Sequence, residues 1–363
     1  MSRTTPSDEF PQLPQELVNT IIDHLLDDIP SLRSCSLVCR TWREHAQESI
    51  FHKQRFYVSG GPQGDLHKFR ILLRMSPHLG ALVKAIELYA IGWVPSTPLP
   101  PNPQLETATP EVLPLLPKLQ TFSLKVTQDK VWDQIVGAPV AEACKSILRT
   151  TFLTDIHLSG MRFDLYSDFI CLLSDIVAVR ELNISAIIIK KYDVAKRVDR
   201  RHLRLTSLHM NLAPALLKVF TQWFLSDESR FDISEIGKLT VLSTPKSTLT
   251  CREALENILK RIEAGAITSL GLQNILSGPL SAFASLRNLQ TITLLTKSLF
   301  PSKSIAWLAQ DIMEGNFHAV REFYVHLEIS PFQDNVPTNN DCHVVDSIAS
   351  TCCDVKVCVV LLC

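Results

Sequence analysis

A short apolar pattern recurs along most of this chain, and it restricts the possible folds more than any other feature. Each copy has the form apolar-x-x-apolar-x-apolar. The residue between the last two apolar positions is mostly polar, and so are the residues on either side of that pair, as at Asp155 and His157. This period of two indicates strands with one buried face. Apolar residues are so frequent here that chance would produce a similar number of triplets, so the alternation carries the prediction. The copies are Val83/Ile86/Leu88, Leu119/Phe122/Leu124, Leu153/Ile156/Leu158, Val179/Leu182/Ile184, Leu205/Leu208/Met210, Ile236/Leu239/Val241, Ile267/Leu270/Leu272, Leu289/Ile292/Leu294, Val320/Phe323/Val325 and Val355/Cys358/Val360.

Helix-length segments separate many of these strands, at 164–176, 213–225, 251–264 and 302–313. Strand, turn and helix in repetition imply parallel strands joined by right-handed crossovers. The copies start 22 to 36 residues apart, mostly further than the roughly 20–29 residues of a leucine-rich repeat. The sequence therefore predicts an α/β fold, with an irregular leucine-rich-repeat-like solenoid over residues 81–363. An ordinary α/β domain is the alternative.

Prolines and glycines mark the other boundaries. Residues 1–10 form a polar tail, and a compact helical unit occupies 11–57. A glycine cluster at 59–64 indicates a linker, and a helix is expected at 65–75, so 58–80 is predicted as linker and helix. Eight prolines lie between 95 and 117, which predicts a loop inside the repeat domain.

The helical unit carries more apolar surface than it can bury. Pro14 suits the first turn of a helix, and Glu16 complements its positive end. Ser31 can cap a second short helix, and Thr41 to Glu44 has the S/T-x-x-E form of a capping box that opens a third. Three helices in fewer than fifty residues cannot cover all their apolar side chains, so the surplus predicts a partner. The first helix has two neighbouring stripes, Leu17/Ile21/Leu25 and Val18/Ile22/Leu26.

These residues resemble the F-box, the helical motif that docks substrate receptors onto the Skp-type adaptor of cullin–RING ubiquitin ligases. The resemblance covers about 12% of the chain, and every element stands in order at ordinary spacing. A three-helix cap on the downstream domain is the alternative. The matching residues are Leu13, Pro14, Glu16, Leu17, Ile21, Leu25, Leu32, Val38, Cys39, Arg40 and Trp42.

The resemblance implies a scaffold that docks on a Skp-type adaptor and a cullin scaffold and presents an unknown client protein. Catalysis would then be proximity, and this chain would be a non-catalytic subunit. Two alternatives stay open: an F-box protein that sequesters or organises a partner without ubiquitin transfer, and an α/β enzyme with a helical cap. By resemblance, Val38, Cys39 and Trp42 would pack the core of the motif and abut the last helices of the adaptor. The implied adaptor-binding residues are Leu13, Pro14, Leu17, Ile21, Leu25, Leu32, Val38, Cys39 and Trp42.

Client contacts are expected from polar strand positions on the concave face of the repeats. Their charges are mixed, so they indicate no class of client. The alternative for each one is an ordinary solvated strand residue. The principal candidates are Tyr89, Asp155, His157, Glu181, Asn183, His209, Tyr324 and His326, with Glu87, Lys125, Lys238, Gln273 and Glu322 beside them.

Composition bounds the remaining classes. Lys and Arg total 36 against 37 for Asp and Glu, which gives no electrostatic footprint for nucleic acid. No apolar stretch is long enough for a membrane span, and no secretory signal is visible, so the ten cysteines are expected as reduced thiols in the cytoplasm or nucleus. No motif predicts a metal or cofactor. The basic run at 190–201 is interpreted as a solvated helix or loop, with a nuclear-import or phosphate-contacting patch as the alternative.

Overall fold

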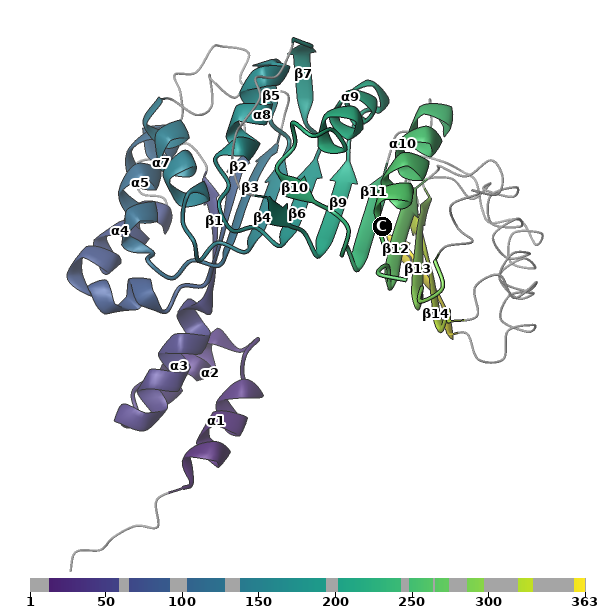
Figure 1. Cartoon of the computed structure of the whole chain (residues 1–363). Helices are drawn as coiled ribbons and strands as arrows, with labels where there is room; N and C mark the ends of the chain where they lie inside the picture. Colours follow the sequence, from purple (N-terminus) through teal and green to yellow (C-terminus); the bar gives the residue numbers. More distant parts are fainter. Residues whose placement is uncertain are drawn as a thin grey trace, which may run out of the picture.

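The computed structural model describes residues 13–58, 65–91, 103–127, 138–193, 202–242, 248–263, 265–273, 286–296, 319–328 and 356–362. It is a mixed α/β structure with two parts. Three N-terminal helices, α1 (Gln15–Asp23), α2 (Ile29–Cys35) and α3 (Arg40–His52), form a small unit that projects from one end of a curved sheet (Figure 1). The predicted tail at 1–10 and the glycine cluster at 59–64 lie outside the described residues.

The ends of the three helices differ from the prediction. Helix α1 ends at Asp23, and the amide of Leu25 donates to the carbonyl of Ile22 at 2.9 Å in the turn that follows. The cap of α2 is Asp28, whose carboxylate accepts hydrogen bonds from both the amide and the hydroxyl of Ser31. The predicted capping box is wrong, because α3 already begins at Arg40 and Cys39 occupies the N-cap.

The apolar triplets predicted every strand of the main sheet except the first. That first strand, β1 (Lys53–Val58), follows α3 directly and crosses the predicted boundary between the helical unit and the linker. Within the described residues, eleven strands pair in parallel in the order β1-β2-β3-β4-β6-β9-β11-β12-β13-β14-β15. The later strands are β2 (Ala85–Ile91), β3 (Thr121–Thr127), β4 (Asp155–Ser159), β6 (Glu181–Ser185), β9 (Ser207–Asn211), β11 (Lys238–Leu242), β12 (Ser269–Gln273), β13 (Thr291–Thr296), β14 (Glu322–Glu328) and β15 (Lys356–Leu362).

The register of the last strand differs by one residue from its triplet. Val357 pairs with Phe323, a fully buried residue of β14. The triplet pattern predicted Cys358 as the partner of Phe323. The alternation of valines in this segment made either register possible from sequence.

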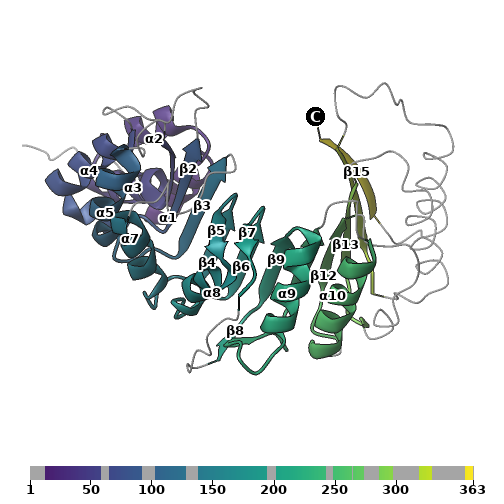
Figure 2. The ribbon, with the colours of Figure 1, turned by 90° about the horizontal axis from the view of Figure 1, so that it is seen from above.

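Helices cover one face of the sheet, which curves so that they lie on its outer side (Figures 1 and 2). The predicted helix at 65–75 is present, and those predicted at 164–176, 213–225 and 251–264 are present with shifted ends. The helix predicted at 302–313 lies outside the described residues. The helices of this layer are α4 (Asp65–Met75), α5 (Pro103–Val112), α7 (Ala138–Leu148), α8 (Tyr166–Ser174), α9 (Pro214–Phe224) and α10 (Thr248–Arg261), with 3₁₀ turns at Pro77–Ala81 and Leu113–Leu115.

The prediction of a proline-rich loop is wrong for residues 103–115, which form α5 and a 3₁₀ turn. Pro103 is the first residue of α5, where a missing amide proton has little consequence. Pro110 lies inside the helix, and burial of the neighbouring Ala108 and Val112 against the sheet compensates for the backbone hydrogen bond that it cannot make. Residues 95–102 are not among those described.

In the described part of the chain, two short strand pairs lie outside the main sheet. Strand β5 (Arg162–Leu165) pairs with β7 (Ile188–Lys191), and β8 (Leu203–Arg204) pairs with β10 (Phe231–Asp232). The start of the basic run at 190–201 therefore belongs to a strand, which corrects the predicted helix or loop for Lys190 and Lys191. Residues 194–201 lie outside the described part.

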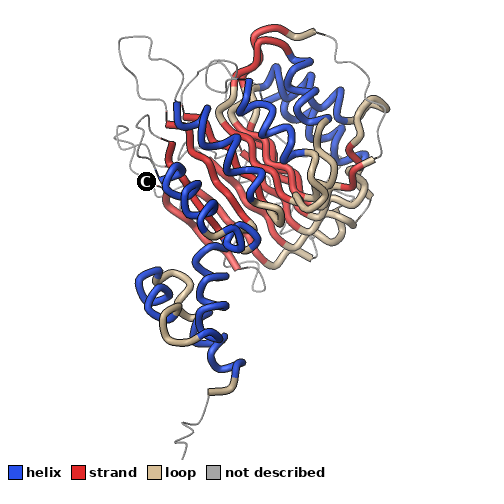
Figure 3. The backbone as a smooth tube through the Cα atoms, turned by 90° about the vertical axis from the view of Figure 1, so that its left-hand side faces the viewer, coloured by secondary structure: helices blue, strands red, loops and turns tan. Residues whose placement is uncertain are grey.

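Figure 3 shows the helices layered on one face of the sheet, and the main core lies between these two layers. Alternate strand residues such as Phe122 and Leu124 meet helix residues such as Phe169 and Phe220, all of them buried. The N-terminal helices have a separate small core of Val18, Ile22, Leu32 and Ala46. The helical unit is therefore packed largely on itself.

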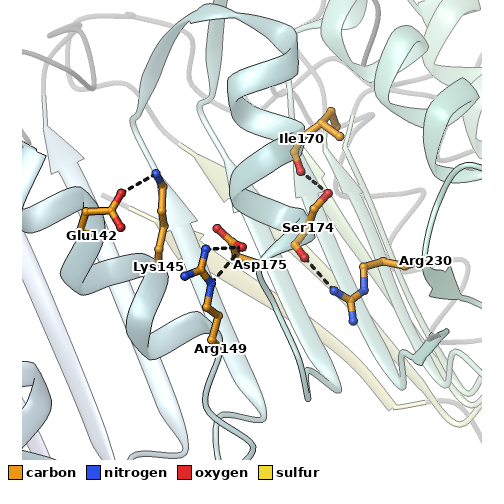
Figure 4. A network of polar contacts seen from close by, with 7 residues as sticks. All are labelled: Glu142, Lys145, Arg149, Ile170, Ser174, Asp175 and Arg230. Atoms are coloured by element: carbon orange, nitrogen blue, oxygen red, sulfur yellow. Dashed lines mark hydrogen bonds and ion pairs between the residues drawn. The ribbon is translucent and has the colours of Figure 1, made fainter. Parts of the chain in front are cut away.

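Polar contacts connect consecutive units on the outer side (Figure 4). Arg149 donates twice to the carboxylate of Asp175, at 2.9 and 3.1 Å, which links the end of α7 to the end of α8. The buried Arg230 donates to the carbonyl of Ser174 at 2.8 Å, at the C-terminal end of α8, where a cation is favoured. These contacts fix the spacing between neighbouring units.

Candidate docking surfaces

A stripe of apolar side chains on α1 is exposed. Leu13, Leu17 and Ile21 lie four residues apart on one face of α1 or directly before it, and 54%, 51% and 39% of their surfaces are accessible. The opposite face of α1 places Val18 and Ile22 in the small core. We call the three exposed residues the α1 stripe. None of them is sealed against a later part of the described chain.

More apolar side chains of the same unit are exposed in or beside the two turns that connect the helices. Leu26 lies in the turn after α1 and Ile29 begins α2, while Leu37 and Val38 lie in the turn between α2 and α3. A monomeric protein rarely leaves so many large apolar side chains uncovered on so small a unit.

The structure separates the residues that resemblance grouped as adaptor-binding. Leu13, Pro14, Leu17 and Ile21 are exposed, and binding through them stays a prediction. Leu32 is fully buried between Val18, Ile22 and Ala46, so its side chain is inaccessible to a partner and its assignment is corrected to core packing.

Leu25 and Trp42 are half-buried against the small core, as expected for Trp42. The other two residues of that group differ from expectation. Val38 and Cys39 are exposed and do not pack into this core, because they lie in the turn where the backbone becomes extended before α3. A contact between Nε2 of His45 and the carboxylate of Asp23, at 3.0 Å, holds α3 beside the end of α1.

The second candidate surface is the sheet face opposite the helices, which we call the inner face. Its residues alternate along each strand with the core residues, and parallel pairing aligns them in rows. The eight predicted client residues all fall on this face: Asp155 and Glu181 in one row, His157, Asn183, His209 and Tyr324 in the next, and Tyr89 and His326 in the third. The pairing brings their strands together, and client binding by them remains a prediction.

A dense charge cluster lies on the inner face at the end nearest the N-terminal helices. The Glu87 carboxylate, only 10% exposed, accepts from Nζ of Lys53 at 2.7 Å, Nε of Arg55 at 2.9 Å and the hydroxyl of Tyr89 at 2.9 Å. Nζ of Lys125 donates to the same tyrosine hydroxyl at 3.0 Å. Sequence reasoning missed Lys53 and Arg55, because the alternation of Arg55 and Tyr57 with Phe56 and Val58 in β1 was not recognised as a strand.

Burial by itself would raise the pKa of Glu87, but hydrogen bonds from Lys53 and Tyr89 and the charges of Lys53 and Arg55 outweigh it and lower the pKa to about 2. A carboxyl whose pKa is lower in the folded chain stabilises the fold above its unfolded pKa, near 4.5. That contribution is lost as the pH falls from about 4.5 towards 2.

We therefore expect acid unfolding of the wild-type chain to depend on Glu87. Thermal unfolding is measured at pH 7 and in the acid range. Between these conditions the wild type should lose up to about 3 kcal/mol of unfolding free energy through Glu87, a loss that Glu87→Gln should not show. Glu181→Gln, which alters an exposed carboxylate on the same face, serves as the matched control. Equal acid sensitivity of Glu87→Gln and the wild type would contradict this assignment.

Two histidines two strands apart complete the middle row of the inner face. Burial lowers the pKa of His157, and burial together with the nearby His157 lowers that of His209. Lower pKa values favour the neutral form of both rings near pH 7.

The described part of the chain contains no group of three or more His, Cys, Asp or Glu residues placed to hold a metal ion. The cysteines with described side chains, Cys35, Cys39, Cys144 and Cys171, are free thiols. Across the described segments, the search found no helix with the length and apolarity required to cross a membrane.

Comparison with protein families identifies the N-terminal unit. Residues 10–57 match the family model described as F-box-like, and these residues include all three N-terminal helices and most of β1. No curated protein matches the chain. The N-terminal helical unit is therefore an F-box-like domain, and the α1 stripe lies within it.

Proposed function

We propose that this F-box protein is a substrate-receptor subunit of an SCF-type cullin–RING ubiquitin ligase in the cytoplasm or nucleus. An F-box-like domain indicates binding to a Skp-type adaptor. The observation that carries the proposal is the exposure of the α1 stripe, since apolar side chains on one helix face are what an adaptor helix would cover. Burial of each of these anchors would contribute about 1.5–3 kcal/mol before association costs.

We infer that the rest of the chain is an irregular leucine-rich-repeat-like solenoid that presents a client on its inner face. The sequential order of the parallel strands and the placement of the helices on the opposite face support this inference. The inner face exposes polar residues in aligned rows, a suitable surface for an extended protein segment. The chain then contributes proximity rather than a catalytic group, and it needs no cofactor.

A reconstituted ligase tests the proposal. Full-length chain, Skp-type adaptor, cullin–RING scaffold and a ubiquitin-charged conjugating enzyme are combined, and ubiquitylation of the full-length chain itself is followed. We expect modification that requires both adaptor and cullin. Adaptor binding without any ubiquitin transfer would instead support a sequestering or structural partner, and failure to bind the adaptor would overturn the proposal.

A further inference from the structure

Among the described residues, the charge cluster at the start of the inner face has more cations than carboxylates. Lys53 and Arg55 on β1 form ion pairs with the carboxylate of Glu87 on β2, and Lys125 on β3 lies on the other side of that strand. That carboxylate is almost buried, whereas 54% of the Lys53 side chain and 49% of the Arg55 side chain are accessible to solvent. The groups of this cluster that are accessible to solvent are therefore mainly cations. We call Lys53, Arg55 and Lys125 the basic cluster.

We propose that the basic cluster binds an acidic segment of the client protein. This inference rests on the proposed function, because it takes the inner face as the client surface and adds the chemistry of the segment that the face selects. Carboxylate side chains are the complementary ligands, since Lys and Arg donors bind them through charge-assisted hydrogen bonds.

The cations are held in place before any ligand binds. The ring of Tyr89 lies between two of them, with the guanidinium carbon of Arg55 5.6 Å and Nζ of Lys125 4.9 Å from its centroid. Contacts to Glu87 and to the tyrosine hydroxyl restrict the same side chains further. A flexible cation loses rotamer entropy on binding, and these contacts reduce that loss.

A hydroxyl adds a neutral donor beside the cluster. Ser123 lies on β3 between Glu87 and His157 in the register, and only 3% of its surface is exposed. Its Oγ is buried without a hydrogen-bond partner in the described structure. Buried hydroxyls normally have a partner, so Ser123 leaves an unused hydrogen-bonding group just beneath the inner face beside the basic cluster.

The next strands carry the opposite charge. Asp155 on β4 and Glu181 on β6 stand side by side on the same face, and hydroxyls of Thr121 and Thr154 hold the Asp155 carboxylate at 3.2 and 2.9 Å. The inner face therefore changes sign between β3 and β4. This change gives a bound segment a direction, with its acidic residues over β1–β3, next to the F-box-like domain (Figure 1).

Binding of labelled peptides to the full-length chain tests the proposal. Fluorescence anisotropy with a fluorescein-labelled hexaglutamate peptide should show binding, while hexaglutamine and hexalysine should bind weakly or not at all. Lys53→Gln and Lys125→Gln should each weaken hexaglutamate binding about fivefold, since each removes one charge-assisted contact. Lys260→Gln removes an exposed cation from α10, in the helical layer on the opposite face of the sheet, and should leave the affinity unchanged.

Three results would overturn the proposal. These are equal binding of hexaglutamate and hexaglutamine, equal affinities for the wild type and the two cluster variants, and binding that persists unchanged in molar salt, which screens such contacts. If a single-stranded oligonucleotide bound more tightly than hexaglutamate, and Lys125→Gln weakened that binding, a nucleic acid would be the favoured ligand of the basic cluster. Adaptor binding is measured in the same preparations, so a chain that binds adaptor without selecting an acidic peptide refutes only the client chemistry. A chain that selects the peptide without binding adaptor refutes the proposed ligase role.

Discussion

The double substitution Leu17→Asp and Ile21→Asp should abolish capture of a Skp-type adaptor and leave the chain folded. Both side chains are exposed in the α1 stripe, so carboxylates there stay in water in the free chain. In a complex, each substitution would remove about 1.5–3 kcal/mol of apolar burial and place an unpaired charge in the interface. We expect the dissociation constant to rise by more than about a hundredfold, as measured by isothermal titration calorimetry.

Phe152→Asp is the matched control for this substitution. Phe152 is also an exposed large apolar residue, at 59%, and it lies in the turn before β4, away from the F-box-like domain. Its replacement by aspartate should not change adaptor affinity. Similar affinities for the control and the double variant, at either the wild-type or the reduced level, would contradict a role specific to the α1 stripe.

Gly160→Ala should strongly destabilise the fold, although it adds only one methyl group. Gly160 follows β4 with a φ of 73°, and an added Cβ would lie 1.7 Å from the backbone oxygen of Val126 at the end of β3. A backbone atom cannot move aside as a side chain does, so the strand ends must separate. We expect the free energy of unfolding to fall by about 2–4 kcal/mol in chemical denaturation.

Gly237→Ala provides the comparison, because this glycine precedes β11 in a part of the sheet with space for a methyl group. An added Cβ would meet its nearest neighbours at 3.8 Å, an ordinary contact distance, and Gly237 does not have a positive φ. The free energy of unfolding of Gly237→Ala should differ from that of the wild type by less than about 1 kcal/mol. If Gly160→Ala were as stable as Gly237→Ala, the close approach of β3 and β4 described here would be wrong.

Sequence was sufficient for the sheet because burial on one face imposes a period of two. Leu182 and Ile184, for example, are buried while Asn183 between them is not. Such triplets predicted ten of the eleven main-sheet strands that the structure describes. Strand β1 was missed because its pattern begins with Lys53 and Gln54 and lacks the early apolar residue of the others. The nearby helix α3 suggested a continuing helical unit instead.

Tertiary packing decided the features that local sequence did not predict. Prolines around α5 suggested a loop, yet burial of Ala108 and Val112 outweighs the hydrogen bond that Pro110 lacks. At α2, Asp28 and Ser31 are both good capping residues, and only the three-dimensional start of the helix separates them.

The candidate surfaces were predicted to different degrees. Helical spacing located the α1 stripe correctly on one face, since residues four apart align in any helix. It did not reveal that Leu32 faces inward, because that depends on how α2 crosses α1 and α3. The basic cluster depends on strand register across β1, β2 and β3, which joins residues more than thirty positions apart.

Hydroxyl-radical footprinting tests the central claim most directly, by comparing the free chain with the chain saturated by a Skp-type adaptor. Leu13, Leu17 and Ile21 should be oxidised in the free chain and protected in the complex, while the buried Val18 and Ile22 resist oxidation in both. Protection of the α1 stripe in the free chain would show that another part of the chain covers it. Undiminished oxidation in the saturated complex would show that the adaptor binds elsewhere.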